Sequence, residues 1–373
     1  MSSAIRSACV ADSPVTARDQ SGPRACARAA RLWRVHPAAA RAVPIFVGMW
    51  SCAQASGEPQ TRSIRDDVER LAIRHRTEHY AISGTVSDAR LADYGRLLEY
   101  IYEEYARGFA ELLDGNRNGT EQRQNKRSGR RGNDRSRSGR SPRGGSKDRG
   151  NRGAAKKTTN GDEGRFRVVI FARKAEYDEF GAAYFGRFSE HTSGMFVPSV
   201  DLLLISDADG PGETSGVLFH EAFHQFLRKH VPFAPIWLNE GLATYYGTAR
   251  PTGKGLVFNE PLQGFFRIVR DAESSRKLLP LDQLVLMSRE AFYNQSLVAG
   301  ESFTRRSLAY AEAYTLTLYL LGDRDGRSHL QDYIRALALA ESAAEAIEVT
   351  KSRFPKRVCD AMKRPWMKVV NRN

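Results

Sequence analysis

A segment of 49 residues in the first half of the chain is not expected to fold, and it separates two parts of the chain that can. Residues 115–163 read GNRNGTEQRQNKRSGRRGNDRSRSGRSPRGGSKDRGNRGAAKKTTNGDE and contain no Leu, Ile, Val, Phe, Trp or Tyr. Such a segment cannot bury enough apolar surface to offset the entropy of ordering it, so it predicts a disordered insertion. A folded region must then be assembled from residues 56–114, which hold a strand and a long helix, and residues 164–373.

The net charge of +14 belongs mainly to segments that we do not expect to fold. Residues 115–160 hold 15 Lys and Arg against 3 Asp and Glu, and residues 1–55 hold 7 against 2. The rest of the chain holds 35 basic and 38 acidic residues and is slightly acidic. One interpretation of the insertion is an arm that binds RNA or another polyanion. We favour a solvated surface insertion, because no aromatic side chains are interleaved to stack on bases.

Residues 1–55 have the features of an export leader. Arginines precede the short apolar stretch AVPIFVGMW, and Ala53-Gln54-Ala55 follows it in A-x-A form. This order is typical of a secretory signal and predicts a periplasmic, secreted or, through Cys52, lipid-anchored protein. The alternative is an unfolded N-terminus with a chance apolar patch on a cytoplasmic protein. No apolar run reaches the roughly 18 to 20 residues of a membrane-spanning helix.

Hydrophobic patterns predict an α+β fold. A long amphipathic helix with Ser87 as N-cap is indicated by apolar residues at helical spacing, namely Leu91, Tyr94, Leu98, Ile101, Tyr105 and Leu112. Strands are predicted at residues 79–85, 165–171 and 200–206. Helices are predicted at residues 176–185, 212–230, 238–247, 260–272, 305–322 and 329–339. We therefore expect a small mixed sheet in the N-terminal half and a helical subdomain in the C-terminal half.

The helix at residues 212–230 carries His220-Glu221-Ala222-Phe223-His224, an H-E-x-x-H motif. Four residues advance a helix by about 400° and about 6 Å, so both imidazoles lie on one face and can reach one Zn²⁺ ion. Glu221 lies beside them, placed to take a proton from a water that the metal activates. The alternative is two histidines at the margin of the helix's core face, which would consist of Leu218, Phe219, Phe223 and Phe226.

A catalytic zinc site needs three protein ligands and one open position. Glu240, in the sequence WLNEGLA on a second helix, is the predicted third ligand. His230 is its rival, because H-E-x-x-H-x-x-G-x-x-H also places a histidine there. That pattern needs a glycine where this chain has Leu227, a good helix former. If the helix continues, six residues turn His230 by about 600°, to a position about 240° around from His224.

The pair of motifs, HEAFH followed by NEGLA, looks like the gluzincin metallopeptidases and more closely resembles the bacterial peptidase MA-like family. The likeness covers roughly residues 79–340 apart from the insertion. It implies a zincin-like fold in which His220, His224 and Glu240 bind Zn²⁺, Glu221 is general base and acid, and the substrate is a peptide or protein. Only 15 residues separate His224 from Glu240, and no G-x-M-E-N motif is present. The resemblance therefore does not extend to the aminopeptidases.

Two further features remain open in the sequence. A hydrolase needs a donor that stabilises the oxyanion; Tyr310 is our candidate and Tyr314, one turn later, the alternative, although either could be core packing. The strand VDLLLIS at residues 200–206 is either a sheet edge that binds an extended peptide or a core strand.

The predicted function is zinc-dependent hydrolysis of peptide bonds by an endopeptidase. The alternatives are a non-catalytic zinc-binding module of the same fold, and a polyanion- or RNA-binding protein acting through residues 115–160. The oligomeric state is not indicated by the sequence.

Overall fold

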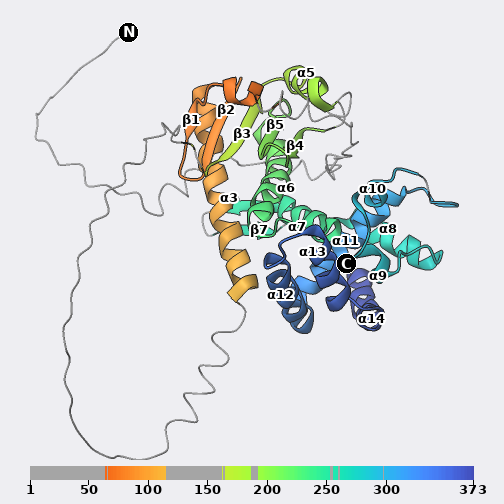
Figure 1. Cartoon of the computed structure of the whole chain (residues 1–373). Coiled ribbons are helices and arrows are strands. Elements are labelled where there is room, and N and C mark those ends of the chain that lie inside the picture. The colour runs from red at the N-terminus through yellow and green to blue at the C-terminus, as the bar shows by residue number, and fades with distance from the viewer. Residues whose placement is uncertain are drawn as a thin grey trace, which may run out of the picture.

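The structure, a computed structural model, describes residues 64, 66–114, 162, 164–185, 192–252, 255–258, 261–296 and 298–373. The predicted export leader and nearly all of the predicted insertion lie outside these residues. Within them, a sheet and a group of C-terminal helices lie at opposite ends, with helix α6 (Pro211–His230) running between them (Figure 1). This arrangement confirms the predicted α+β fold with a mixed sheet packed on the helix of the H-E-x-x-H motif.

A five-stranded mixed sheet forms the N-terminal part. Its strands are β1 (His75–Arg76), β2 (Tyr80–Gly84), β3 (Phe166–Phe171), β4 (Gly194–Val197) and β5 (Leu202–Ser206). They lie in the order β1-β2-β3-β5-β4, in which β2, β3 and β5 are parallel and the two edge strands are antiparallel to their neighbours. Strands β2 and β3 precede and follow residues 115–163, and Ile82 pairs with Val168. The sheet thus joins the two parts of the chain.

Helices cover both faces of this sheet. On one face, α6 and the long helix α3 (Asp88–Asp114) share a core with the strand residues Ile82, Val168, Ile170, Leu203 and Ile205. On the other face, α5 (Lys174–Phe185) and the segment near Ile64 share a core with Val169, Phe171, Leu202 and Leu204. Successive strand residues point to opposite faces, so near-continuous apolar runs are expected where both faces are covered.

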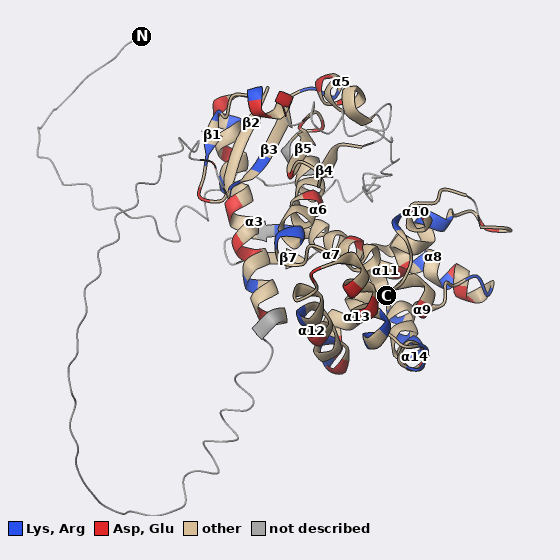
Figure 2. Ribbon diagram, viewed as in Figure 1, with Lys and Arg blue, Asp and Glu red and all other residues tan. Residues whose placement is uncertain are grey.

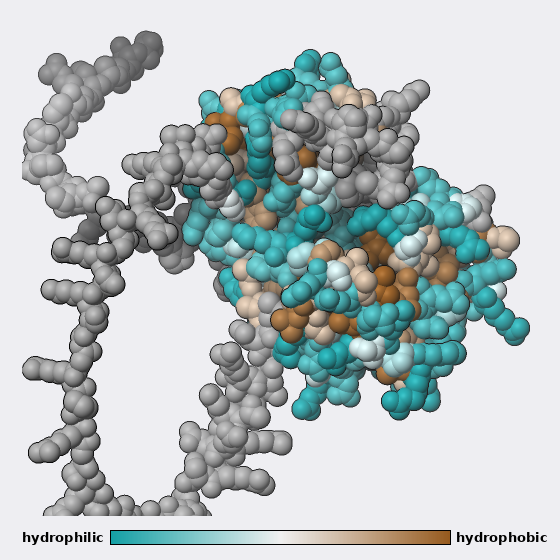
Figure 3. Space-filling view, viewed as in Figure 1, coloured by the Kyte–Doolittle hydropathy of each residue, from teal (hydrophilic) through white to brown (hydrophobic). Residues whose placement is uncertain are grey.

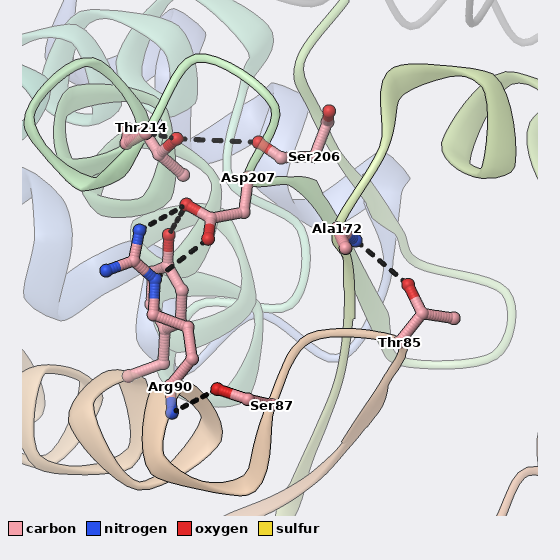
Figure 4. A network of polar contacts seen from close by, with 9 residues as sticks. Thr85, Ser87, Arg90, Ala172, Ser206, Asp207 and Thr214 are labelled. Carbon is pink, nitrogen blue, oxygen red and sulfur yellow. Dashed lines mark hydrogen bonds and ion pairs between the residues drawn. The ribbon is translucent and has the colours of Figure 1, made fainter.

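The predicted stripe of helix α3 is buried as expected, and Ser87 caps the helix. The Ser87 hydroxyl accepts a hydrogen bond from the N–H of Arg90 at 3.3 Å. Further along, the Arg90 guanidinium binds Asp207, the residue after β5, at 2.8 Å, and the Tyr94 hydroxyl donates to the same carboxylate at 2.5 Å (Figure 4). Because the Asp207 side chain is only 8% exposed, this ion pair is sheltered from water. It fixes α3 to the loop from which α6 begins.

The remaining elements form the helical C-terminal region. They are α7 (Ile236–Gly247), the hairpin β6 (Ala249–Thr252) and β7 (Gly255–Phe258), α8 (Gln263–Ser274), α9 (Leu281–Leu284), α10 (Arg289–Phe292), α11 (Arg305–Gly322), α12 (Arg324–Ala338), α13 (Ala343–Arg353) and α14 (Lys356–Arg372). Helix α11 lies at the centre, packed against α7, α8, α12 and α14. Residues predicted as one helix, 305–322, match α11 at both ends.

The strand VDLLLIS is a core strand, so its interpretation as a sheet edge is wrong. Strand β5 lies between β3 and β4, and all five of its residues are buried. The edge strand next to α6 is β4 instead. Its sequence GMFV did not suggest a strand, because all four residues are buried and the sequence shows no alternation of apolar and polar residues. Any extended ligand that adds to this side of the sheet must therefore add to β4.

Charge and hydropathy are distributed in the way expected of a folded domain with balanced charge. Acidic and basic residues are interspersed along the described helices and strands (Figure 2). On the face drawn in Figure 3, apolar residues show mainly among the C-terminal helices. Within the described ranges, no helix combines the length and the apolar character needed to cross a bilayer.

Candidate metal centre

Helix α6 brings His220 and His224 together, one turn apart. The Nε2 atoms of the two imidazoles lie 3.0 Å apart, and the ring planes are nearly perpendicular, at 88°. Both side chains are buried. The core residues expected on this helix, Leu218, Phe219, Phe223 and Phe226, are buried as well. The histidines therefore form a separate polar site beside the apolar core rather than filling part of it.

Helix α7 supplies the third group, Glu240. Its Oε2 atom lies 3.4 Å from Nε2 of His220 and 3.6 Å from Nε2 of His224. Glu240 is only 2% exposed. The next residue, Gly241, explains how α7 can lie so close to α11. A Cβ atom at Gly241 would meet the Thr317 hydroxyl at 2.3 Å and the Ala313 carbonyl oxygen at 2.7 Å. Glycine in the NEGLA sequence thus permits the helix packing that positions Glu240.

The three groups could hold one metal ion, and their spacing fits a zinc ion. Two imidazole nitrogens and one carboxylate oxygen all lie within 4.8 Å of one another. Donors around a tetrahedral zinc at about 2.0 to 2.1 Å are separated from each other by about 3.3 Å. The separations of 3.0, 3.4 and 3.6 Å bracket that value. Oε2 of Glu240 is also buried with no hydrogen-bond partner, which is costly for a carboxylate oxygen unless a cation satisfies it.

Two neighbouring side chains orient the ligands. Nδ1 of His224 lies 3.1 Å from the side-chain oxygen of Asn239. Because an amide oxygen only accepts, Nδ1 carries the proton and Nε2 keeps its lone pair for the site. The hydroxyl of Tyr293 donates to Oε1 of Glu240 at 2.6 Å, which leaves Oε2 facing the histidines. Tyr293 was not anticipated from the sequence, since it lies 53 residues from Glu240 beside the short helix α10.

The charges of the three groups are strongly interdependent. Burial opposes ionisation of Glu240, but His224, His220 and the Tyr293 hydroxyl outweigh it and lower the pKa of this carboxyl to about 2. Burial, together with the charge of His220, lowers the pKa of His224 to about 4. Burial also opposes protonation of His220, yet Glu240 and Glu221 raise its pKa. Glu240 is thus ionised and His224 neutral, as metal ligands must be, whereas the raised pKa of His220 means that a metal ion competes with a proton at this residue.

Glu221 lies on the wall of a small cavity beside the triad. Its Oε2 atom accepts the backbone N–H of Phe196, on the edge strand β4, at 2.9 Å. Burial, and to a smaller extent the charge of Glu240, raise the pKa of Glu221 to about 7. Gly194 makes this approach possible, because a Cβ there would lie 2.4 Å from the Val217 side chain and 3.1 Å from Cγ of Glu221. A carboxyl with a pKa near neutrality is suited to taking up and releasing protons.

The cavity has a volume of about 70 Å³ and opens next to the candidate metal ligands. Its wall combines groups of the site with residues of β4, the end of α6 and α10. The lining residues are Met195, Phe196, Pro198, Glu221, His224, Arg228, Val231, Pro232, Ala234, Asn239, Glu240, Arg289 and Tyr293. A ligand in this cavity would contact Glu221 together with His224 and Glu240 of the triad.

The tyrosines proposed from the sequence lie away from this cavity. Tyr310 is buried close to Glu240 and Tyr293, and it is not among the residues that line the cavity. Tyr314 accepts the backbone N–H of Leu262 at 3.4 Å and packs against the aromatic rings of α8. Among the described tyrosines, Tyr293 is the one that lines the cavity. A role for Tyr310 as an oxyanion donor stays a prediction.

His230 is the last residue of α6, because the helix continues past Leu227 as its residues predict. Its ring packs on Phe226, with centroids 4.5 Å apart, and on Phe109 of α3, at 5.8 Å. It is not part of the group that could bind metal within the described ranges. The helical rotation between His224 and His230 places the His230 ring on the side of α6 that faces α3.

Comparison with known proteins adds no assignment. No protein-family model matches this chain, and a search of curated proteins finds no significant match. The buried triad is consistent with a zincin-like site on its geometry alone.

Proposed function

We propose that this protein is a zinc-dependent peptidase of the gluzincin type. The observation that carries the proposal is the position of Glu221, a buried carboxyl with a pKa of about 7 on the wall of a cavity that is also lined by His224 and Glu240 of the triad. A purely structural zinc site needs neither a cavity nor an unligated carboxylate beside the metal. Their combination supports hydrolysis rather than a structural metal.

The donor set supports zinc as the metal. Two imidazoles and one carboxylate form the ligand set of several catalytic zinc sites, and they leave a fourth position open. Zinc held by His220, His224 and Glu240 would supply Lewis-acid activation of water and of the scissile carbonyl group.

The chain's own residues would carry the proton. Phe196 N–H holds Oε2 of Glu221, and we assign Oε1 as the atom that takes the proton from the attacking water. The same carboxyl would then deliver this proton to the amine that leaves. A pKa of about 7 suits both transfers, because the group is neither too weak a base nor too weak an acid at neutral pH.

Edge strand β4 offers a backbone for an extended substrate. Met195, Phe196 and Pro198 line the cavity, so a peptide that adds to this edge would pass directly over the site. We propose peptide or protein substrates cleaved internally, and, from the leader-like residues 1–55, an enzyme that works outside the cytoplasm.

The test combines metal analysis with a digest. Protein purified without added metal should contain about one zinc per chain, and it should cleave casein or members of a random peptide library. Removing the metal with a chelator should abolish cleavage, and adding zinc should restore it. Zinc without cleavage of any substrate would oppose the peptidase and favour the non-catalytic module. Protein that takes up no zinc would overturn the proposal entirely.

A further inference from the structure

Two arginines share the cavity with the proposed catalytic groups. Arg228 lies on α6, one helical turn beyond His224, and Arg289 is the first residue of α10. The first turn of α10 is held by its N-cap, since the Ser288 hydroxyl accepts the N–H of Ala291 at 3.2 Å. The guanidinium carbon of Arg289 lies 5.9 Å from the ring centre of Tyr293. Both cations therefore come from elements that also position the site.

Among the residues that the structure describes, the wall of the cavity carries two acidic side chains. Apart from Glu221 and Glu240, the described residues that line it include no Asp or Glu. Glu240 is directed at the two histidines and Tyr293, and Glu221 at the Phe196 N–H. Arg228 and Arg289 therefore line a cavity whose two carboxylates contact other groups, and the charge of Arg228 also acts on Asp201, which is not a lining residue.

The surroundings strengthen the effect of these charges. Apolar residues form much of the wall, namely Met195, Phe196, Pro198, Val231, Pro232 and Ala234. Charge interactions are stronger beside such a wall than in open water.

We infer that this cavity selects substrates with a carboxylate close to the scissile bond, and that Arg289 and Arg228 bind that carboxylate. The inference rests on the proposed peptidase function. Guanidinium groups bind carboxylates through paired, charge-assisted hydrogen bonds, which fix orientation as well as charge. The carboxylate can be an Asp or Glu side chain or the α-carboxylate of a peptide C-terminus.

The experiment uses two sets of fluorescein-labelled hexapeptides and the full-length, zinc-loaded protein. In the first set the C-terminus is amidated and one position at a time is Glu or Gln. In the second set no residue is acidic, and the C-terminus is either free or amidated. Cleavage is measured with the wild-type protein, and binding is measured by fluorescence anisotropy with Glu221→Gln, which should bind without cleaving.

A carboxylate peptide should bind about tenfold or more tightly than its neutral partner, as expected for a hydrogen bond to a charged group. Preference for Glu over Gln in the first set identifies a side-chain carboxylate, and preference for the free terminus in the second identifies an exopeptidase. Arg289→Gln and Arg228→Gln, each added to Glu221→Gln, should reduce the ratio of the affinities for carboxylate and neutral peptides toward one. Arg364→Gln, at an exposed position on α14, is the matched control and should leave it unchanged.

The ratio of the affinities for carboxylate and neutral peptides distinguishes recognition of the carboxylate from general damage to the site. If Arg289 only supported Tyr293, Arg289→Gln would weaken carboxylate and neutral peptides equally and lower the zinc content, which would contradict the inference. Arg289→Lys should retain part of the preference. Equal binding of charged and neutral peptides in both sets would overturn the inference while leaving peptidase activity intact. Charge-dependent binding without any turnover by the wild-type protein would instead support the inference and oppose the proposed function.

Discussion

Tyr293 donates its hydroxyl hydrogen to Oε1 of Glu240 across 2.6 Å, while Oε2 of the same carboxylate faces His220 and His224. One oxygen is thus fixed by protein and the other is left for a metal ion. Outer partners of this kind set the orientation of metal ligands. This hydrogen bond joins α7 to the residue after α10, and so it links the candidate metal centre to the wall of the cavity.

Tyr293→Phe should therefore weaken zinc binding without unfolding the protein. The substitution keeps the ring that packs on Phe292 and Tyr310 and removes only the hydroxyl. Loss of such a partner typically reduces metal affinity by about 10 to 100-fold. Competition with a coloured chelator measures it. Tyr314→Phe is the control, because its hydroxyl binds the Leu262 backbone instead. Unchanged zinc affinity in Tyr293→Phe would show that the hydrogen bond does not position Glu240.

The identity of the third ligand can be tested by a pair of alanine variants. Glu240→Ala should lose most of its zinc, since it removes one of three converging donors. His230→Ala should retain about one zinc per chain, because His230 lies against Phe109 and Phe226. Elemental analysis after dialysis gives both numbers. The opposite pattern, with zinc lost only from His230→Ala, would assign the site to a different ligand set.

Gly241→Ala should destabilise the protein through the contact between α7 and α11. The new Cβ would lie 2.3 Å from Oγ1 of Thr317 and 2.7 Å from the Ala313 carbonyl oxygen, and the backbone atom cannot move aside cheaply. Overpacking of this kind typically costs about 1 to 3 kcal/mol, or several degrees in the thermal midpoint. Gly264→Ala is the matched control, since a Cβ at this exposed position on α8 meets nothing within 4 Å. Equal midpoints for both variants would contradict the packing argument.

The buried Glu312 predicts a pH-dependent contribution to stability. Burial raises the pKa of this carboxyl well above its usual value, although the N–H of Leu279, donated at 2.9 Å, partly opposes the shift. A raised pKa in the folded state gives a contribution that is fully present at low pH, below about 4.3, and is lost as the pH rises toward the folded-state pKa. Neutral glutamine avoids this loss.

Glu312→Gln should consequently gain stability relative to the wild-type protein between pH 5 and pH 8. Its amide oxygen can still accept the N–H of Leu279. Thermal midpoints of both proteins across this range provide the measurement, and Glu348→Gln, at an exposed position on α13, is the control. A constant difference between Glu312→Gln and the wild-type protein at every pH would contradict the prediction.

Local patterns in the sequence predicted the parts of the site that depend on helix geometry. The spacing of His220 and His224, and the rotation that excludes His230, follow from helical rise and twist alone. Helix α11 was predicted at its observed ends, and the structure shows that Thr304 caps its first turn by accepting the N–H of Ser307. Such features need no knowledge of distant contacts.

The features that were missed depend on contacts between distant segments. Tyr293 meets Glu240 only because α10 packs against α7 and α11, and no periodic pattern marks the irregular stretch around it. Strand β4 is four buried residues long, which is too short to show a period. Tyr310 lies on the expected helix, but it is buried close to Glu240 and Tyr293 and is not among the residues that line the cavity.

The most direct test of the account is the zinc content and peptidase activity of Glu221→Gln. The amide should preserve the shape of the side chain and about one zinc per chain, because Glu221 is not among the converging ligands. Without a carboxylate to accept the proton, hydrolysis of casein or a library-selected peptide should fall by several orders of magnitude. A variant that holds zinc and cleaves peptides at the wild-type rate would contradict the central claim that Glu221 is the general base of a zinc peptidase.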